Sequence, residues 1–75
     1  MRRELPILKP KQVVAALEKS GFQIRRQTGS HVIMYKTDIH HPISIPLHPG
    51  DLPKGTLRAI IRQARLTVEE LIDLL

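Results

Sequence analysis

The spacing of apolar residues changes twice along this chain, and that change limits the folds it can adopt. Apolar side chains recur at helical spacing in residues 10–20 and again in residues 53–64. Between these segments, residues 22–47 contain runs in which apolar and polar side chains alternate, which is typical of strands. The chain has 75 residues and no cysteine, so it has room for one domain without disulfides. We therefore expect a single domain, residues 1–75, in which helices flank a block of strands.

The first helix is expected over about residues 10–20. Pro10 suits the first helical position, because its missing N–H would have no partner there. Gly21 supplies the left-handed residue that ends a helix, and Phe22 is placed to fold back on Leu17 as in a Schellman motif. Before this helix, we expect residues 1–8 to form a flexible or loosely packed lead.

Three short strands are expected to follow, at residues 22–27, 31–36 and 43–47. The alternation in the first strand predicts that it is half-buried. A Thr28-Gly29-Ser30 turn separates it from the second, and residues 37–42 read as a loop. Both faces of the second strand, His31/Ile33/Tyr35 and Val32/Met34/Lys36, carry apolar side chains, so the pattern does not tell which one is buried. Pro46 has no N–H for a ladder, which predicts an edge position for the third strand.

The last part of the chain is expected to hold two helices. One begins near Pro53 or Lys54, and its apolar stripe comprises Leu57, Ile60, Ile61 and Ala64. Thr67 and Glu70 match a capping box that opens a short last helix. The apolar side of that helix comprises Val68, Leu71, Ile72 and Leu75. The order α-β-β-β-α-α predicts an α+β fold, a three-stranded antiparallel sheet with the helices on one face, and it resembles the double-stranded-RNA-binding domain.

The charge of the chain points to a polyanionic partner. Lys and Arg number 12 against seven Asp and Glu, for a formal charge of +5, and residues 1–36 hold eight of the basic residues but only two acids. Such a distribution is most simply explained by binding to nucleic acid. An ordinary protein with a high pI fits the composition equally well. We expect no signal peptide and no membrane span, which fits a cytoplasmic protein.

His31 is the leading candidate for chemistry. The Gly29-Ser30-His31 segment delivers a histidine to the start of a strand, where its ring is open to a ligand. Histidine is suited to move protons near neutral pH. RNA carries its own nucleophile, the 2′-hydroxyl, so a base that removes its proton needs no metal. A strand histidine with a structural hydrogen bond is the simpler alternative, and it is the commoner case for a lone histidine.

A row of cations is expected on the second long helix. Arg58, Arg62 and Arg65 follow Lys54 at helical spacing, opposite the apolar stripe, with no carboxylate among them. Such a row fits phosphates, although an ordinary solvated helix face explains it as well. Arg25 and Arg26 in the first strand are further candidates to extend the patch. Because successive strand residues point to opposite faces, only one of Arg25 and Arg26 is expected to join a given surface.

The remaining histidines do not predict a metal site. His40 and His41 are adjacent in an extended segment, so they point apart, and no carboxylate or cysteine completes a ligand spacing with His48. We therefore expect no metal and no cofactor. His48 is a candidate to bind or orient the substrate. The simpler alternative is an ordinary loop residue with no functional role.

Four ordered segments give the chain a family resemblance. They are Gly21-Phe22, Gly29-Ser30-His31, Ile45-Pro46-Leu47-His48-Pro49-Gly50 and Lys54-Gly55-Thr56-Leu57-Arg58-Ala59-Ile60. In this order and at this spacing, over residues 9–75, they resemble the HicA toxins. That resemblance implies an endoribonuclease that cleaves mRNA and blocks translation, a HicB-type antitoxin as partner, and a catalytic role for His31.

The resemblance assigns no role to the cations or to His48, and two other functions stay open. One is a non-catalytic RNA-binding module with the same fold and basic face. The other is an interaction subunit whose basic surface serves only an acidic protein. RNA cleavage that persists in excess chelator and disappears when His31 is replaced would distinguish the endoribonuclease from both of these alternatives.

Overall fold

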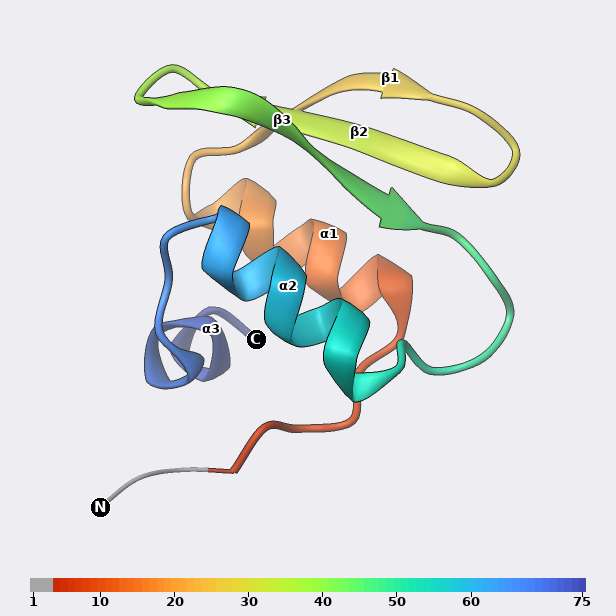
Figure 1. Ribbon diagram of the computed structural model, residues 1–75, viewed down its shortest axis with the longest axis vertical. Coiled ribbons are helices and arrows are strands. Elements are labelled where there is room, and N and C mark those ends of the chain that lie inside the picture. The colour runs from red at the N-terminus through yellow and green to blue at the C-terminus, as the bar shows by residue number, and fades with distance from the viewer. Residues whose placement is uncertain (1–3) are drawn as a thin grey trace.

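A computed structural model, which describes residues 4–75, has the expected α+β architecture (Figure 1). The elements are α1 (Pro10–Lys19), β1 (Gln23–Gln27), β2 (His31–Lys36), β3 (Ile39–Pro46), α2 (Lys54–Gln63) and α3 (Val68–Leu74). The strands form one antiparallel sheet in the order β1-β2-β3. In Figure 1 the helices all lie on one side of this sheet, and none of the described helices or strands covers its other side. In the described part of the chain, no helix is long and apolar enough to cross a membrane.

The two long helices end in the same way. After α1, Phe22 N donates to Leu17 O at 3.0 Å and Gly21 N donates to Glu18 O at 3.1 Å, with Gly21 at a φ of +106°. This is the predicted Schellman motif. After α2, the equivalent bond joins Leu66 N to Ile61 O at 3.1 Å. Here the left-handed residue is Arg65, with a φ of +58°.

The core lies between the sheet and the helices. Val32 and Met34 of β2, at 3% and 0% exposure, pack with fully buried Ile43 and Ile45 of β3 and with Leu17 of α1. These residues decide which face of β2 is buried. By strand alternation, His31, Ile33 and Tyr35 therefore lie on the face that no helix covers.

The third strand is longer than expected. It begins at Ile39, so the predicted loop over residues 37–42 shrinks to a two-residue turn at Thr37 and Asp38. Ile39 pairs with Lys36 and is only 7% exposed, so burial of its side chain draws the segment into the sheet. The register between β2 and β3 shifts between Lys36 and Met34. The predicted edge position is confirmed, since β3 pairs with β2 alone.

The first strand departs from the predicted half-buried pattern. All five residues of β1 are exposed, and Ile24 retains 41% of its accessible surface. The strand lies at the other edge of the sheet, and its register with β2 shifts between Ile24 and Arg26. Arg25 is the extra residue of this β-bulge. The bulge breaks the alternation of faces only beyond Ile24, which pairs with buried Met34. The exposure of Ile24 itself reflects the position of β1 at the edge of the sheet.

The two ends of the chain also differ from expectation. Residues 1–3 of the expected lead lie outside the described residues, but Leu8, its last residue, is 3% exposed and accepts a 2.8 Å hydrogen bond from Leu52 N. At the other end, the capping box is present: Thr67 N donates to Glu70 Oε1 at 2.8 Å, and Glu70 N donates to Thr67 Oγ1 at 3.1 Å. Leu75 was expected on the apolar side of this helix, but it is 49% exposed because α3 ends before it.

The end of α1 gives a test of the fold. Gly21→Ala places a Cβ at a φ of +106°, 3.2 Å from Lys36 Cε. We expect the free energy of unfolding to fall by about 1–2 kcal/mol, because an L side chain is strained there. Gly55→Ala in the first turn of α2 is the matched control, since its Cβ meets nothing within 4 Å. The control should be neutral or stabilising by up to about 1 kcal/mol. Denaturant unfolding of both variants measures this, and equal effects would contradict it.

Candidate functional site

The turn before β2 holds His31 through hydrogen bonds to Thr28. Thr28 Oγ1 accepts from His31 N at 3.0 Å and from Ser30 N at 3.3 Å, while Thr28 N donates to His31 O at 2.9 Å. A threonine hydroxyl that binds the backbone two or three residues ahead is a local turn motif. The Thr28-Gly29-Ser30 segment therefore fixes the backbone of His31 at the rim of the sheet, as predicted.

The ring of His31 is held as well. Ser30 Oγ lies 3.0 Å from His31 Nδ1, and both side chains are exposed. In the tautomer that carries its proton on Nδ1, His31 donates to Ser30 Oγ, and Nε2 can accept a proton. Ser30 thus orients the imidazole while the ring remains open to a ligand.

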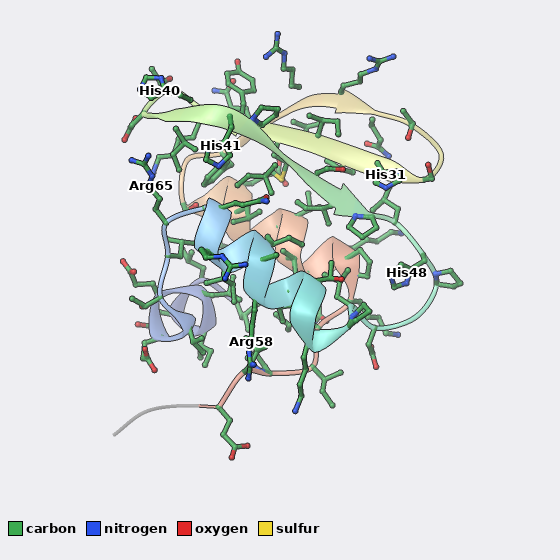
Figure 2. The ribbon with its side chains drawn as sticks, in the orientation of Figure 1. His31, His40, His41, His48, Arg58 and Arg65 are labelled. Atoms are coloured by element: carbon green, nitrogen blue, oxygen red, sulfur yellow. The ribbon has the colours of Figure 1, made fainter. Side chains whose placement is uncertain are left out.

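The end of β3 lies beside this turn. Leu47 N donates to Ser30 O at 2.7 Å, and His48 is the next residue along the chain. Figure 2 shows His31 and His48 at the same end of the sheet. The structure therefore brings Ser30, His31 and the backbone next to His48 to one place, three of the positions that the sequence singled out.

The cations of α2 lie elsewhere. Arg58 extends from α2 away from the sheet, on the opposite side of the molecule from His31 (Figure 2). Lys54 and Arg58 line an open pocket of about 970 Å³ together with Glu4 and Glu69. Two carboxylates in this lining weaken its attraction for a phosphate. The structure thus does not join these two cations to His31.

Arg65 is also separate from the predicted row. It follows the end of α2 in a left-handed conformation, so its side chain does not continue the helical spacing of Arg58 and Arg62. Figure 2 shows Arg65 at the end of the molecule that carries His40 and His41, away from His31. Arg62 is exposed in the last turn of α2. The sequence predicted a continuous line of cations because it did not show where the helix stops.

The bulge in β1 gathers cations on the uncovered face. Arg25 lies over the ring of Tyr35, with 5.8 Å between its Cζ and the ring centroid, and Arg26 pairs with Ile33. Both arginines line a shallow hollow of about 360 Å³ together with Ile33 and Pro42. The expectation that only one of them can join a surface is therefore wrong. No sequence signal marked the bulge, so only Arg25 of the two was kept among the predicted site residues.

Comparison with known proteins adds to this geometry. Residues 10–66 match the family described as the HicA toxin of bacterial toxin–antitoxin systems. The chain belongs to the HicA toxin family. The matched segment contains the whole sheet, the Gly29-Ser30-His31 turn and α2, whereas α3 lies beyond it. No curated protein matches the chain.

Membership identifies the chain as a toxin of a toxin–antitoxin system, with a cognate antitoxin as partner. HicA toxins are in general ribonucleases. Among residues 4–75 of this HicA chain, no group of three or more His, Asp or Glu side chains is arranged to hold a metal ion.

The turn itself can be tested without reference to activity. Thr28→Val keeps the shape of the side chain but removes the oxygen that accepts from Ser30 N and His31 N. We expect the HicA chain to lose about 1 kcal/mol of stability, since exposed hydrogen bonds are worth about 0.5–1.5 kcal/mol each. Amide hydrogen exchange at His31 should accelerate. Thr28→Ser, which keeps the oxygen, is the control, and unchanged exchange in the valine variant would show that the hydroxyl does not hold the turn.

Proposed function

We propose that this chain is a metal-independent endoribonuclease that cleaves mRNA and so blocks translation, with His31 as its general acid or base. The observation that carries the proposal is the exposed imidazole at the rim of the sheet, held at Nδ1 by Ser30 at 3.0 Å. A rigid backbone and an oriented ring are what a proton-transfer group requires. Family membership supports the ribonuclease class.

The proposed reaction uses the substrate's own nucleophile. His31 Nε2 removes the proton of a 2′-hydroxyl, and the oxygen attacks the adjacent phosphorus. The bond from phosphorus to the 5′-oxygen breaks, which leaves a 2′,3′-cyclic phosphate on one product. The departing 5′-oxygen takes a proton from water or from a second acid and becomes a 5′-hydroxyl. His48, beside the same turn, is our candidate for that second group.

Phosphate contacts complete the proposed site. Arg25 shares the uncovered sheet face with His31, and Ser30 orients the imidazole. Contacts of RNA with the α2 side stay a prediction. Arg58 points away from His31 and Arg65 lies at the far end of the molecule (Figure 2), so contacts through them would hold distant nucleotides and not the scissile one. The other proposed phosphate contacts of this helix are Lys54, which lines the same pocket as Arg58, and Arg62.

Replacement of His31 tests the proposal directly. His31→Ala should lower the cleavage rate by about 10²–10⁴-fold, the usual contribution of a general acid or base. It should keep the melting temperature, because the side chain is exposed at the rim and not in the core. A 2′-deoxy substitution at the scissile nucleotide should block the wild-type protein equally. Cleavage is measured in excess chelator with a labelled RNA.

The rival reading makes His31 a packing residue. It requires His31→Ala to melt well below the wild type, with activity falling only in step with the folded fraction. A folded His31→Ala protein that cleaves at the wild-type rate would end the assignment and make His48 the next residue to test. Binding of RNA without cleavage by the wild type would favour the alternative, a non-catalytic RNA-binding module.

We further propose that the antitoxin is of the HicB type and that it covers His31. A solvent-open cationic site is easily blocked by an acidic surface. RNA and antitoxin should then compete, so that labelled RNA leaves the His31→Ala toxin as the antitoxin is titrated in. The same titration with heat-denatured antitoxin is the control. A ternary complex with RNA still at His31 would point to inhibition from a distance.

A further inference from the structure

The uncovered face of the sheet carries a cationic hollow that neither the family match nor the catalytic assignment explains. Arg25, Arg26, Ile33 and Pro42 line it, and its volume is about 360 Å³. In the described chain, the only acidic residue from β1 to the end of β3 is Asp38, in the turn between β2 and β3. A hollow that two arginines line together with the apolar side chains of Ile33 and Pro42 suits a ligand with both a phosphate and a flat or apolar part.

The bulge makes this arrangement possible. The register between β1 and β2 shifts between Ile24 and Arg26, so that Arg25 is left without a partner on β2. The two successive arginines then line the same hollow, which a regular strand would not allow. Bulges are frequent beside functional sites, where they redirect a side chain. An arginine pair can hold a phosphate through several N–H donors at once.

One of these arginines is also held in place by its neighbours. Arg25 Cζ lies 5.8 Å from the centroid of the Tyr35 ring, within the range of a cation–π contact. The Tyr35 hydroxyl donates to Gln23 Oε1 at 3.1 Å, which fixes the ring. Because the Arg25 side chain is already ordered, a ligand that binds it loses less affinity to the conformational entropy of that side chain.

The hollow lies next to the proposed catalytic residue. Ile33 and His31 are on the same face of β2 and two residues apart, which separates them by about 7 Å along the strand. A strand of RNA that crosses this face would thus reach the hollow and His31 with neighbouring nucleotides. Arg58 of α2 does not share this face, as its direction in Figure 2 shows.

We propose that this hollow is the nucleotide subsite that positions single-stranded RNA for cleavage: Arg25 and Arg26 hold a phosphate next to the scissile one, and Ile33 and Pro42 contact the adjoining base or ribose. The proposal rests on the proposed function, because it places the RNA relative to His31. It assigns Arg26 as a positioning residue. It also departs from the double-stranded RNA that the fold resemblance suggests, since an unpaired nucleotide fits a shallow hollow and a duplex does not.

Binding and cleavage should be measured separately. In the His31→Ala background, a short fluorescent single-stranded RNA is titrated at several salt concentrations. Arg26→Ala should weaken binding about tenfold, and the slope of log affinity against log salt should become shallower by about 0.7 for each phosphate that the variant no longer binds. Arg26→Lys should keep the slope but recover only part of the affinity, because lysine lacks the bidentate fork. The double variant Arg25→Ala/Arg26→Ala should bind more weakly still.

Lys11→Ala is the matched control for removal of one positive charge. Lys11 is exposed in the first turn of α1, so its replacement should change neither the affinity for a short RNA nor the fold. A duplex of the same sequence should bind less tightly than the single strand. With His31 restored, Arg26→Ala should raise KM more than it lowers kcat, as expected for a residue that binds substrate without reacting.

The outcomes separate the subsite from the proposed function. One outcome is that the salt dependence of RNA affinity is shallower in Arg26→Ala than in the wild type, while the wild type cleaves no RNA. This result would support the hollow as an RNA site and end the ribonuclease assignment. Equal affinities of the wild type, Arg26→Ala and the double variant for the short RNA would overturn the subsite and leave the role of His31 intact. Loss of antitoxin binding alone in these variants would also overturn it, and would make the face a protein interface.

Discussion

The packing of helices on one face of the sheet is the constraint on which the rest of this structure depends. Val32, Met34, Ile43 and Ile45 are at most 3% exposed, and burial of an aliphatic side chain of this size contributes about 1.5–3 kcal/mol. A small domain has few such residues, so the register of its sheet cannot slip without exposing all of them. Once these side chains point to the helices, alternation places His31 on the uncovered face. The core thus determines which face of the sheet stays open to solvent.

Much of the fold could be predicted from the sequence because its signals were local. The Schellman motif at Gly21 and the capping box of Thr67 and Glu70 are each set by residues within a few positions of one another, and both are present. The edge position of β3 followed from Pro46, whose missing N–H no tertiary context can restore. Likewise, the turn at Thr28-Gly29-Ser30 was predicted from residue types alone.

The features that the sequence did not reveal all depend on pairing or packing between distant segments. The early start of β3 depends on burial of Ile39 against the core. Which face of β2 is buried depends on where the helices lie. The bulge at Arg25 depends on register with β2, which no local pattern encodes. The same holds for the candidate site. Ser30 and His31 were found by a local motif, whereas the α2 cations were grouped by helical spacing and the fold directs Arg58 away from His31.

The division of the sheet into two faces also separates the residues that stabilise the fold from those of the proposed site. Ser30, His31, Arg25 and Arg26 are all exposed, and each lies on a strand or turn whose backbone the core already fixes. Substitution there removes no buried contact, so it should change chemistry or affinity without changing the melting temperature. The converse holds for Met34 or Ile43, whose truncation would leave a cavity worth about 2–5 kcal/mol and disturb both faces at once. A toxin built this way can be inactivated at its surface by a partner while its core remains intact. If the antitoxin covers the exposed face, as proposed, inhibition does not require the toxin to change its fold.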